Sequence, residues 1–209
     1  MSTLDSFRDD LIRDIDESSN LIRTVNRIMS TTGLPINLSV SQRDTIVEWA
    51  FVNVLTTWEN FLENCFLTYM LGAQTASGYG PVRYVFPNDK QHALGVILAG
   101  REFFQWTNPK KVKEQADLCF ENGEPFRTVL DPATADLMEM NTIRNTIVHR
   151  SMVALENFKI LVRDKLKTAP LGIRPGVFLT TTRPKTLQTT FLSSYCNKLR
   201  LIAKKIVPE

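Results

Sequence analysis

The chain has 209 residues, of which 43% are hydrophobic and 22% are charged. These fractions are typical of a folded globular protein, and they exclude an intrinsically disordered or collagen-like chain. The formal net charge of +3 is too small to indicate a nucleic-acid-binding protein by itself, so any contact with nucleic acid depends on local charge placement.

The sequence does not indicate a membrane-spanning, secreted or metal-binding protein. Its apolar stretches are interrupted by charges before they reach the length of a membrane span, and the first ten residues lack the apolar core of a signal peptide. Cys65, Cys119 and Cys196 show no CxxC spacing, which indicates free thiols in a reducing compartment. His92 has no cysteine or second histidine at ligand spacing. We therefore expect a cytoplasmic protein without a membrane segment, a metal or a cofactor.

Apolar residues recur at three- and four-residue steps along most of the chain, which is the period of an amphipathic helix. The first helix is predicted to run for about 25 residues from Leu4 and to end before Gly33. A capping-box pair, Ser39 and Gln42, predicts a second helix over about 41–71.

The rest of the chain is also predicted to be helical. A loop rich in Gly, Ser and Pro is expected over 73–88, and strand character is limited to Val177–Thr181, which is too short to build a sheet. The later helices are predicted over about 89–105, 109–121, 132–150, 154–167 and 186–206. We therefore expect an all-α protein, a single domain over 1–209 formed by a bundle of about six to seven helices.

The helix expected over 132–150 places a basic residue among apolar ones. On a helical wheel, Arg144 falls within the apolar arc, where a guanidinium is costly unless it meets a carboxylate, a phosphate or water. Asn141, Asn145 and His149 form a polar stripe beside the arc. Because Arg144 and His149 lie about 140° apart on an ideal helix, we expect a shared site to need two such helices across a two-fold axis. The residues of the apolar arc are Ala133, Leu137, Met140, Ile143, Ile147 and Val148.

Arg144, Asn145 and His149 form the pattern Arg-Asn-x-x-x-His late in this all-α sequence. The pattern resembles the Arg-x4–6-His motif of the HEPN superfamily (higher eukaryote and prokaryote nucleotide-binding domains), in which the first x is often Asn. The resemblance covers the helical core over about 5–206, including the Trp-Glu-Asn-Phe-Leu-Glu segment at 58–63. Within that core only the six-residue motif is specific.

The resemblance implies a homodimer whose paired motif helices form an endoribonuclease site that works without a metal. His149 would act as the general acid or base while a 2′-hydroxyl attacks the neighbouring phosphate. Arg144 would hold that phosphate and stabilise its developing charge, and Asn145 would orient His149 or the phosphate. The products would carry 2′,3′-cyclic phosphate and 5′-hydroxyl ends. Family members of this kind often serve as toxins or in defence against phage, so an antitoxin or another regulatory protein is a possible partner.

Four further residues are candidates for a supporting role. Asn141 and Arg150 flank the motif and are expected to contact the RNA, although Arg150 also fits a solvated neighbour. Glu48 and Glu59 lie in an apolar sector of the second helix, where a carboxylate, like the guanidinium of Arg144, is costly unless it has a partner. We expect Glu59, or failing that Glu48, to pair with Arg144.

Two other interpretations of the motif stay open. His149 also fits a histidine that is favoured at a helix C-terminus by the helix dipole, and Arg144 fits a structural arginine paired with a buried acid. At the level of the whole protein, the alternative is a non-catalytic HEPN-like dimer that binds nucleotide, RNA or a partner protein.

Overall fold

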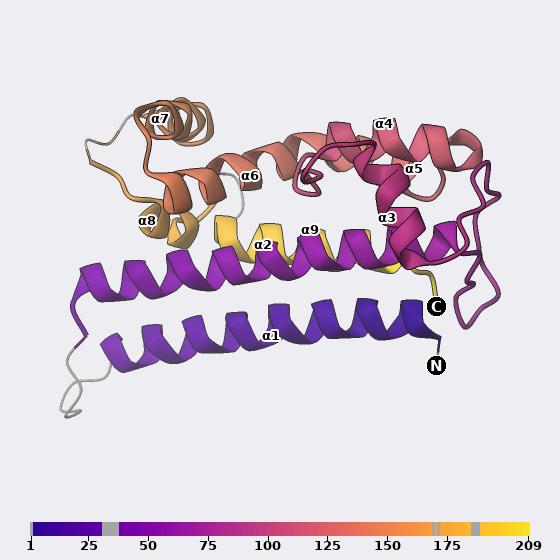
Figure 1. Cartoon of the computed structure of the whole chain (residues 1–209). Helices are drawn as coiled ribbons and strands as arrows, with labels where there is room; N and C mark the ends of the chain where they lie inside the picture. The colour runs from indigo at the N-terminus through magenta and orange to yellow at the C-terminus, as the bar shows by residue number, and fades with distance from the viewer. Residues whose placement is uncertain (1, 31–37, 169, 171, 185–188) are drawn as a thin grey trace. The chain divides into compact units, whose positions relative to one another are not determined.

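The computed structural model describes residues 2–30, 38–168, 170, 172–184 and 189–209, and the fold of these residues is all-helical (Figure 1). Two short 3₁₀ helices, at Glu121–Gly123 and Asp131–Ala133, lie on either side of α5. The α-helices are α1 (Thr3–Ser30), α2 (Val40–Met70), α3 (Lys90–Leu98), α4 (Pro109–Cys119), α5 (Phe126–Leu130), α6 (Thr134–His149), α7 (Met152–Leu166), α8 (Pro175–Thr180) and α9 (Phe191–Ile206). No helix within the described ranges is both long and apolar enough to cross a membrane.

The chain forms two compact units. The first unit comprises Met1–Ile12, Thr57–Met138 and Lys198–Glu209. The second unit comprises Arg13–Thr56 and Glu139–Asn197. Helices α1, α2, α6 and α9 each contribute residues to both units, whereas α3 to α5 belong to the first and α7 and α8 to the second.

The core of the first unit is built around aromatic side chains. The ring of Phe66 on α2 lies 5.5 Å from that of Trp106, 5.0 Å from that of Phe120 and 4.7 Å from that of Phe126, centroid to centroid. One turn further along α2, the buried Tyr69 hydroxyl donates a hydrogen bond of 2.7 Å to the backbone oxygen of Ile206. This bond satisfies a polar group that would otherwise be costly to bury, and it joins α2 to the end of α9.

The core of the second unit is a chain of aromatic contacts from α7 through α8 to α9. Phe178 stacks on Phe191 with ring centroids 4.3 Å apart, and it meets Phe158 of α7 edge-on at 5.8 Å. Tyr195 of α9 extends the series to Phe51 of α2 at 6.3 Å. These side chains are all buried, so α7, α8, α9 and the first half of α2 share one apolar core.

Glu48 holds α8 against α2. Its Oε1 atom accepts a hydrogen bond of 3.1 Å from the backbone N–H of Gly176, and its Oε2 atom accepts one of 3.3 Å from Arg174. The two helices approach so closely that a Cβ atom on Gly176 would lie 2.4 Å from the backbone oxygen of Asp44. Glu48 is buried, and its two oxygens are both bonded. Glu48, the second choice of partner for Arg144, is thus bonded to Arg174 and Gly176 within this chain.

Several predicted elements differ from those observed. The helix predicted over 89–105 ends at Leu98, because Ala99 and Gly100 adopt left-handed backbone conformations with φ of 46° and 83°. The short helix α5 was not predicted.

The strand character assigned to Val177–Thr181 is wrong, because most of this segment belongs to helix α8. Pro175 starts that helix, and the hydroxyl of Thr180 bonds back to the backbone oxygen of Gly176 at 3.0 Å. The last helix was predicted from residue 186, which lies outside the described residues, and it is observed from Phe191.

Candidate functional site

The motif lies at the C-terminal end of α6, in the second unit. The apolar positions that the wheel placed on one arc are buried, with one exception, Val148, which is 41% exposed. Asn141, Arg144 and Asn145 are half-buried, and His149 is exposed. The polar stripe and Arg144 therefore border the surface, where a substrate can reach them. The buried positions of the arc are Ala133, Leu137, Met140, Ile143 and Ile147.

Arg144 brings the three motif residues together within one chain. Its Nη1 atom lies 3.5 Å from Nε2 of His149 and donates a hydrogen bond of 3.3 Å to Oδ1 of Asn145. The expectation that one helix cannot aim Arg144 and His149 at a common point is therefore wrong. The wheel describes the directions of the Cβ atoms, whereas the long arginine side chain reaches along the helix surface.

The contact between Arg144 and His149 constrains the imidazole. A guanidinium has donors and no acceptor, so Nε2 of His149 must be the acceptor in this contact. The proton of the neutral ring then lies on Nδ1. In this arrangement the lone pair of Nε2 faces the Arg144 guanidinium.

Arg144 has no acidic partner within the described part of the second unit. Glu139, on the same helix, is bonded instead to Lys165 and to the hydroxyl of Tyr195, the latter at 3.0 Å. Glu59 belongs to the first unit, and its pairing with Arg144 stays a prediction. The guanidinium is thus positioned by the amide of Asn145 and by His149 rather than by a carboxylate of this unit, which leaves its charge available for an anion.

Two residues, Arg150 and Ser151, connect α6 to α7, and the turn begins at Arg150. Arg150 adopts a left-handed conformation with φ of 49°, and its N–H donates to the backbone oxygen of Thr146 at 3.3 Å. Ser151 then caps α7 by accepting a hydrogen bond of 3.2 Å from the N–H of Ala154. His149 and Arg150, both exposed, are therefore held in a tight helix–turn–helix segment.

Thr146 is a functional candidate that the sequence analysis missed. This residue is 2% exposed, and its hydroxyl lies 2.9 Å from the backbone oxygen of Thr142 and 3.0 Å from that of Ala154. The second contact joins the first turn of α7 to the last turn of α6, directly beneath the motif. A hydroxyl on the edge of the apolar arc was the signal in the sequence that pointed to such a contact.

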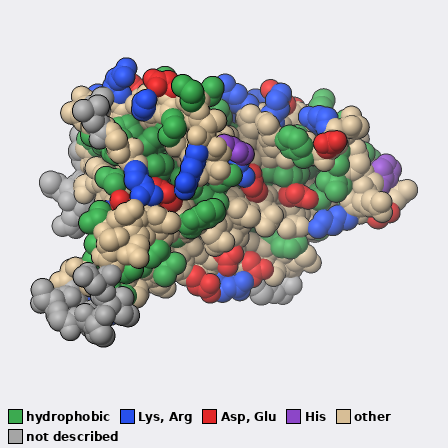
Figure 2. Space-filling view, turned by 60° about the vertical axis from the view of Figure 1, so that its left-hand side comes forward, with side chains coloured by type: hydrophobic (Ala, Val, Ile, Leu, Met, Phe, Trp, Pro, Cys, Tyr) green, Lys and Arg blue, Asp and Glu red, His purple; other side chains and the backbone are tan. Residues whose placement is uncertain are grey.

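Acidic and basic side chains are interspersed on the face shown in Figure 2, in agreement with the net charge of +3. Near the motif itself, the positive charges come from Arg144 and Arg150. The electrostatic attraction for an anion is therefore local to the end of α6.

The described residues offer little support for metal or thiol chemistry. They contain no group of three or more His, Cys, Asp or Glu side chains that could hold a metal ion. Burial raises the pKa of the Cys65 and Cys119 thiols, so neither is a ready nucleophile. His92 accepts a hydrogen bond of 3.3 Å on Nδ1 from the N–H of Asn88, near the start of α3. It thus has a local structural contact.

Comparisons with family models, with curated proteins and with solved structures find no match to this chain.

Proposed function

We propose that the chain is a metal-independent endoribonuclease whose site is formed by Arg144, Asn145 and His149. The observation that carries this proposal is the contact between the Arg144 guanidinium and Nε2 of His149, on the accessible end of α6. A phosphate that binds Arg144 lies within reach of an imidazole nitrogen that can exchange a proton. The pattern Arg-Asn-x-x-x-His itself resembles the motif of the HEPN superfamily, and the proposed activity is taken from that resemblance.

The proposed reaction is a transfer of the phosphoryl group within the RNA. Nε2 of His149 takes the proton from the 2′-hydroxyl, and the 2′-oxygen forms a bond to the adjacent phosphorus. The bond from phosphorus to the 5′-oxygen then breaks, and an imidazolium returns a proton to that oxygen. Arg144 stabilises the negative charge that builds up on the phosphoryl oxygens, and Asn145 holds Arg144 in place. One fragment ends in a 2′,3′-cyclic phosphate and the other in a 5′-hydroxyl.

We propose Asn141 and Arg150 as residues that contact the RNA on either side of this site. Asn141 lies on the same half-buried stripe as Asn145, two helical turns before His149. Arg150 is exposed directly after His149. The amide of Asn141 can bond to sugar or phosphate oxygens of an RNA strand that crosses the motif, and the cation of Arg150 can bind a phosphate of the same strand.

A homodimer is also part of the proposal. Directly after the motif, Met152 and Val153 are 87% and 71% exposed, and Val148 on α6 is 41% exposed. Burying these side chains against a second chain would be favourable, at roughly 25 cal/mol per Å² of apolar surface. Because one chain already assembles Arg144, Asn145 and His149, the dimer is proposed for stability and for the path of the RNA. A role as a cytoplasmic toxin or in phage defence, with an antitoxin or another regulatory partner, follows from the family resemblance.

A ribonuclease assay tests the proposal. Purified protein is incubated with a 5′-labelled single-stranded RNA in excess EDTA, and the ends of the products are identified. We expect cleavage with cyclic phosphate ends, and a loss of at least about 100-fold in rate for His149→Ala. His92→Ala is the matched control and should cleave normally. Equal cleavage by the wild type and His149→Ala would contradict the proposal.

The second candidate function is binding without cleavage. It is favoured by one observation, which is that Arg144 is the sole hydrogen-bond partner of the His149 ring among the described residues. A catalytic histidine commonly has a further partner that fixes its orientation. Binding of RNA that is weakened by Arg144→Ala, with no cleavage by the wild type, would support this alternative.

A further inference from the structure

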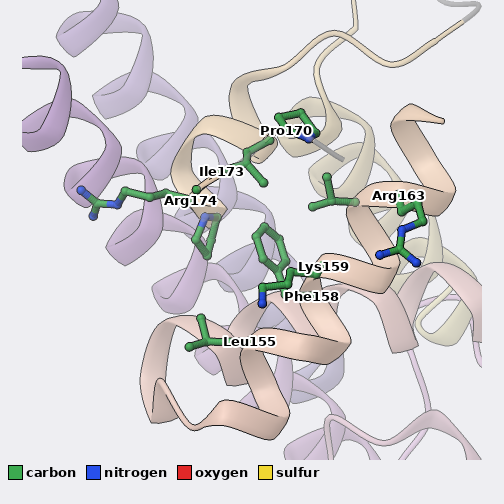
Figure 3. A pocket seen from close by; sticks show the side chains of 10 residues that line it. Leu155, Phe158, Lys159, Arg163, Pro170, Ile173 and Arg174 are labelled. Carbon is green, nitrogen blue, oxygen red and sulfur yellow. The ribbon is translucent and has the colours of Figure 1, made fainter. Parts of the chain in front are cut away.

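A cavity of about 460 Å³ lies in the second unit, between α7 and the segment that leads into α8 (Figure 3). This volume is within the range of small-molecule sites in proteins, roughly 300–1,000 Å³. In Figure 3 the side chains of Phe158 and Ile173 point toward each other from the two walls. The apolar part of the lining is formed by Leu155, Phe158, Val162, Pro170, Ile173 and Pro175.

The remaining side chains that line the cavity are basic. Lys159 and Arg163 lie one turn apart on α7, and Arg174 lies at the start of α8. None of the described residues that line the cavity is acidic. The cavity therefore combines apolar walls with positive charge at its edge.

The three basic groups are not equally available to a ligand. The side chain of Arg174 extends away from the cavity, and its guanidinium bonds to Ser41, at 2.9 Å, and to Glu48 on α2 (Figure 3). Lys159 forms an ion pair of 3.2 Å with Glu156, but both side chains are largely exposed, so this pair is weak. Arg163 is exposed, and its guanidinium has no hydrogen bond or ion pair within the described residues. Of the three basic groups, the Arg163 guanidinium is thus the one left available for an anionic group.

We propose that this cavity binds an unbranched aliphatic carboxylate of medium chain length, with the chain against Phe158 and Val162 and the carboxylate at Arg163. Charge complementarity favours an anion, and a planar guanidinium matches a carboxylate in a two-point contact. A nucleotide fits less well, because the described residues of the walls include no uncharged polar side chain that could bond to a base edge. This site does not depend on the proposed ribonuclease activity.

Isothermal titration calorimetry with decanoate, below its critical micelle concentration, tests the site. We expect saturable binding of one decanoate per chain, and much weaker binding of decanol, which has the same chain without the charge. Arg163→Gln should weaken decanoate binding by about tenfold, the effect of losing one charge-assisted hydrogen bond. Arg23→Gln, at an exposed arginine on α1, is the matched control and should bind as the wild type does.

A second pair of variants tests the apolar walls. Leu155, which lines the cavity, and Ile160, which does not, are on the same helix and are 41% and 51% exposed. Leu155→Glu places a negative charge at the cavity and should abolish decanoate binding, whereas Ile160→Glu should leave it unchanged. Circular dichroism confirms that both variants are folded. Equal binding by these two variants, equal affinity for decanol and decanoate, or no binding by the wild type at about 1 mM decanoate would overturn the proposal.

Discussion

The Nη1 atom of Arg144 lies 3.5 Å from Nε2 of His149, although the two residues diverge by about 140° on an ideal helix. The contact is possible because the four rotatable bonds of arginine carry its guanidinium along the surface of α6. It places a permanent cation beside the one titratable ring of the motif. Arg144 can therefore neutralise a phosphate at the point where His149 transfers a proton.

Replacing Arg144 by lysine tests whether the shape of the guanidinium matters beyond its charge. Both contacts of Arg144 come from Nη1, so its Nη2 and Nε atoms are left to donate to two oxygens of a phosphate, a geometry that the single ammonium of lysine cannot reproduce. We expect Arg144→Lys to lower kcat by about 10- to 100-fold, with a smaller effect on the Kd for RNA. Single-turnover cleavage and fluorescence anisotropy measure the two quantities. Cleavage by Arg144→Lys at the wild-type rate would show that charge alone is sufficient.

Thr146→Val tests the hydrogen bond that joins α7 to α6. The variant keeps the shape of the side chain but loses the hydroxyl that contacts the backbone oxygen of Ala154. We expect the free energy of unfolding to fall by about 0.5–1.5 kcal/mol, because the side-chain hydrogen bond between the two helices is lost. Urea denaturation measures this change. Thr146→Ser is the control that restores the hydroxyl, and it should recover most of the loss; if Thr146→Val is as stable as the wild type, the contact is unimportant.

Gly176→Ala tests the close approach of α8 to α2. An added Cβ atom would lie 2.4 Å from the backbone oxygen of Asp44, so the two helices must separate and strain the bond to Glu48. We expect a destabilisation of about 1–3 kcal/mol, the usual range for overpacking. The matched control is Gly95→Ala in α3, where no atom lies within 4 Å of the added Cβ. That substitution should stabilise the protein by about 0.5–1 kcal/mol, and thermal melts of the two variants should move in opposite directions.

Asp5 is expected to make stability sensitive to acid. The hydrogen bond from the Ser2 hydroxyl holds the pKa of this buried carboxyl below its usual value, with further contributions from the N–H of Ser2, the N–H of Ala76 and the charge of Arg8. In the unfolded chain the pKa of an aspartate is about 3.9, and in the folded chain the pKa of Asp5 is lower. The ionised Asp5 carboxylate therefore stabilises the fold at pH values above the unfolded pKa. This stabilisation is lost as the pH falls through the folded pKa.

The corresponding experiment compares the wild type with Asp5→Asn by urea denaturation between pH 7 and pH 3. At pH 7, Asp5→Asn should be less stable by about 1–3 kcal/mol, because charge-assisted hydrogen bonds become neutral ones. The difference should shrink below about pH 4, as the wild-type carboxyl takes up its proton. A difference that stays constant with pH would exclude a role for the charge of Asp5.

Helix boundaries were predictable where local chemistry sets them. The capping box at Ser39 and Gln42 is present, with hydrogen bonds of 2.8 Å and 3.2 Å, and α2 ends within one residue of its predicted limit. Asn108 likewise caps α4, by accepting a bond from the N–H of Lys110 at 3.1 Å. The end of α3 was missed because Ala99, which has no special preference for a left-handed conformation, adopts one there.

The candidate site was predictable in its residues but not in its geometry. A wheel gives the direction in which a side chain leaves the helix, so it placed Arg144 and His149 apart, and it could not describe a flexible arginine that bridges them. It also could not identify the partner of Glu48, because Arg174 and Gly176 are brought to it by tertiary packing. Contacts between distant parts of the chain need the fold, whereas caps and turns need only a few neighbouring residues.

The turn from α6 to α7, which consists of Arg150 and the capping residue Ser151, fixes the length of the chain between the motif and the next helix. Ser151 caps α7 immediately afterwards, and Thr146 of α6 bonds to Ala154 in the first turn of α7. The connecting segment is therefore held at both of its ends. An inserted residue would rotate and shift α7 relative to α6, whereas many substitutions of the exposed Arg150 side chain would leave both helices where they are. Variation among related proteins should therefore alter the composition of this turn far more readily than its length.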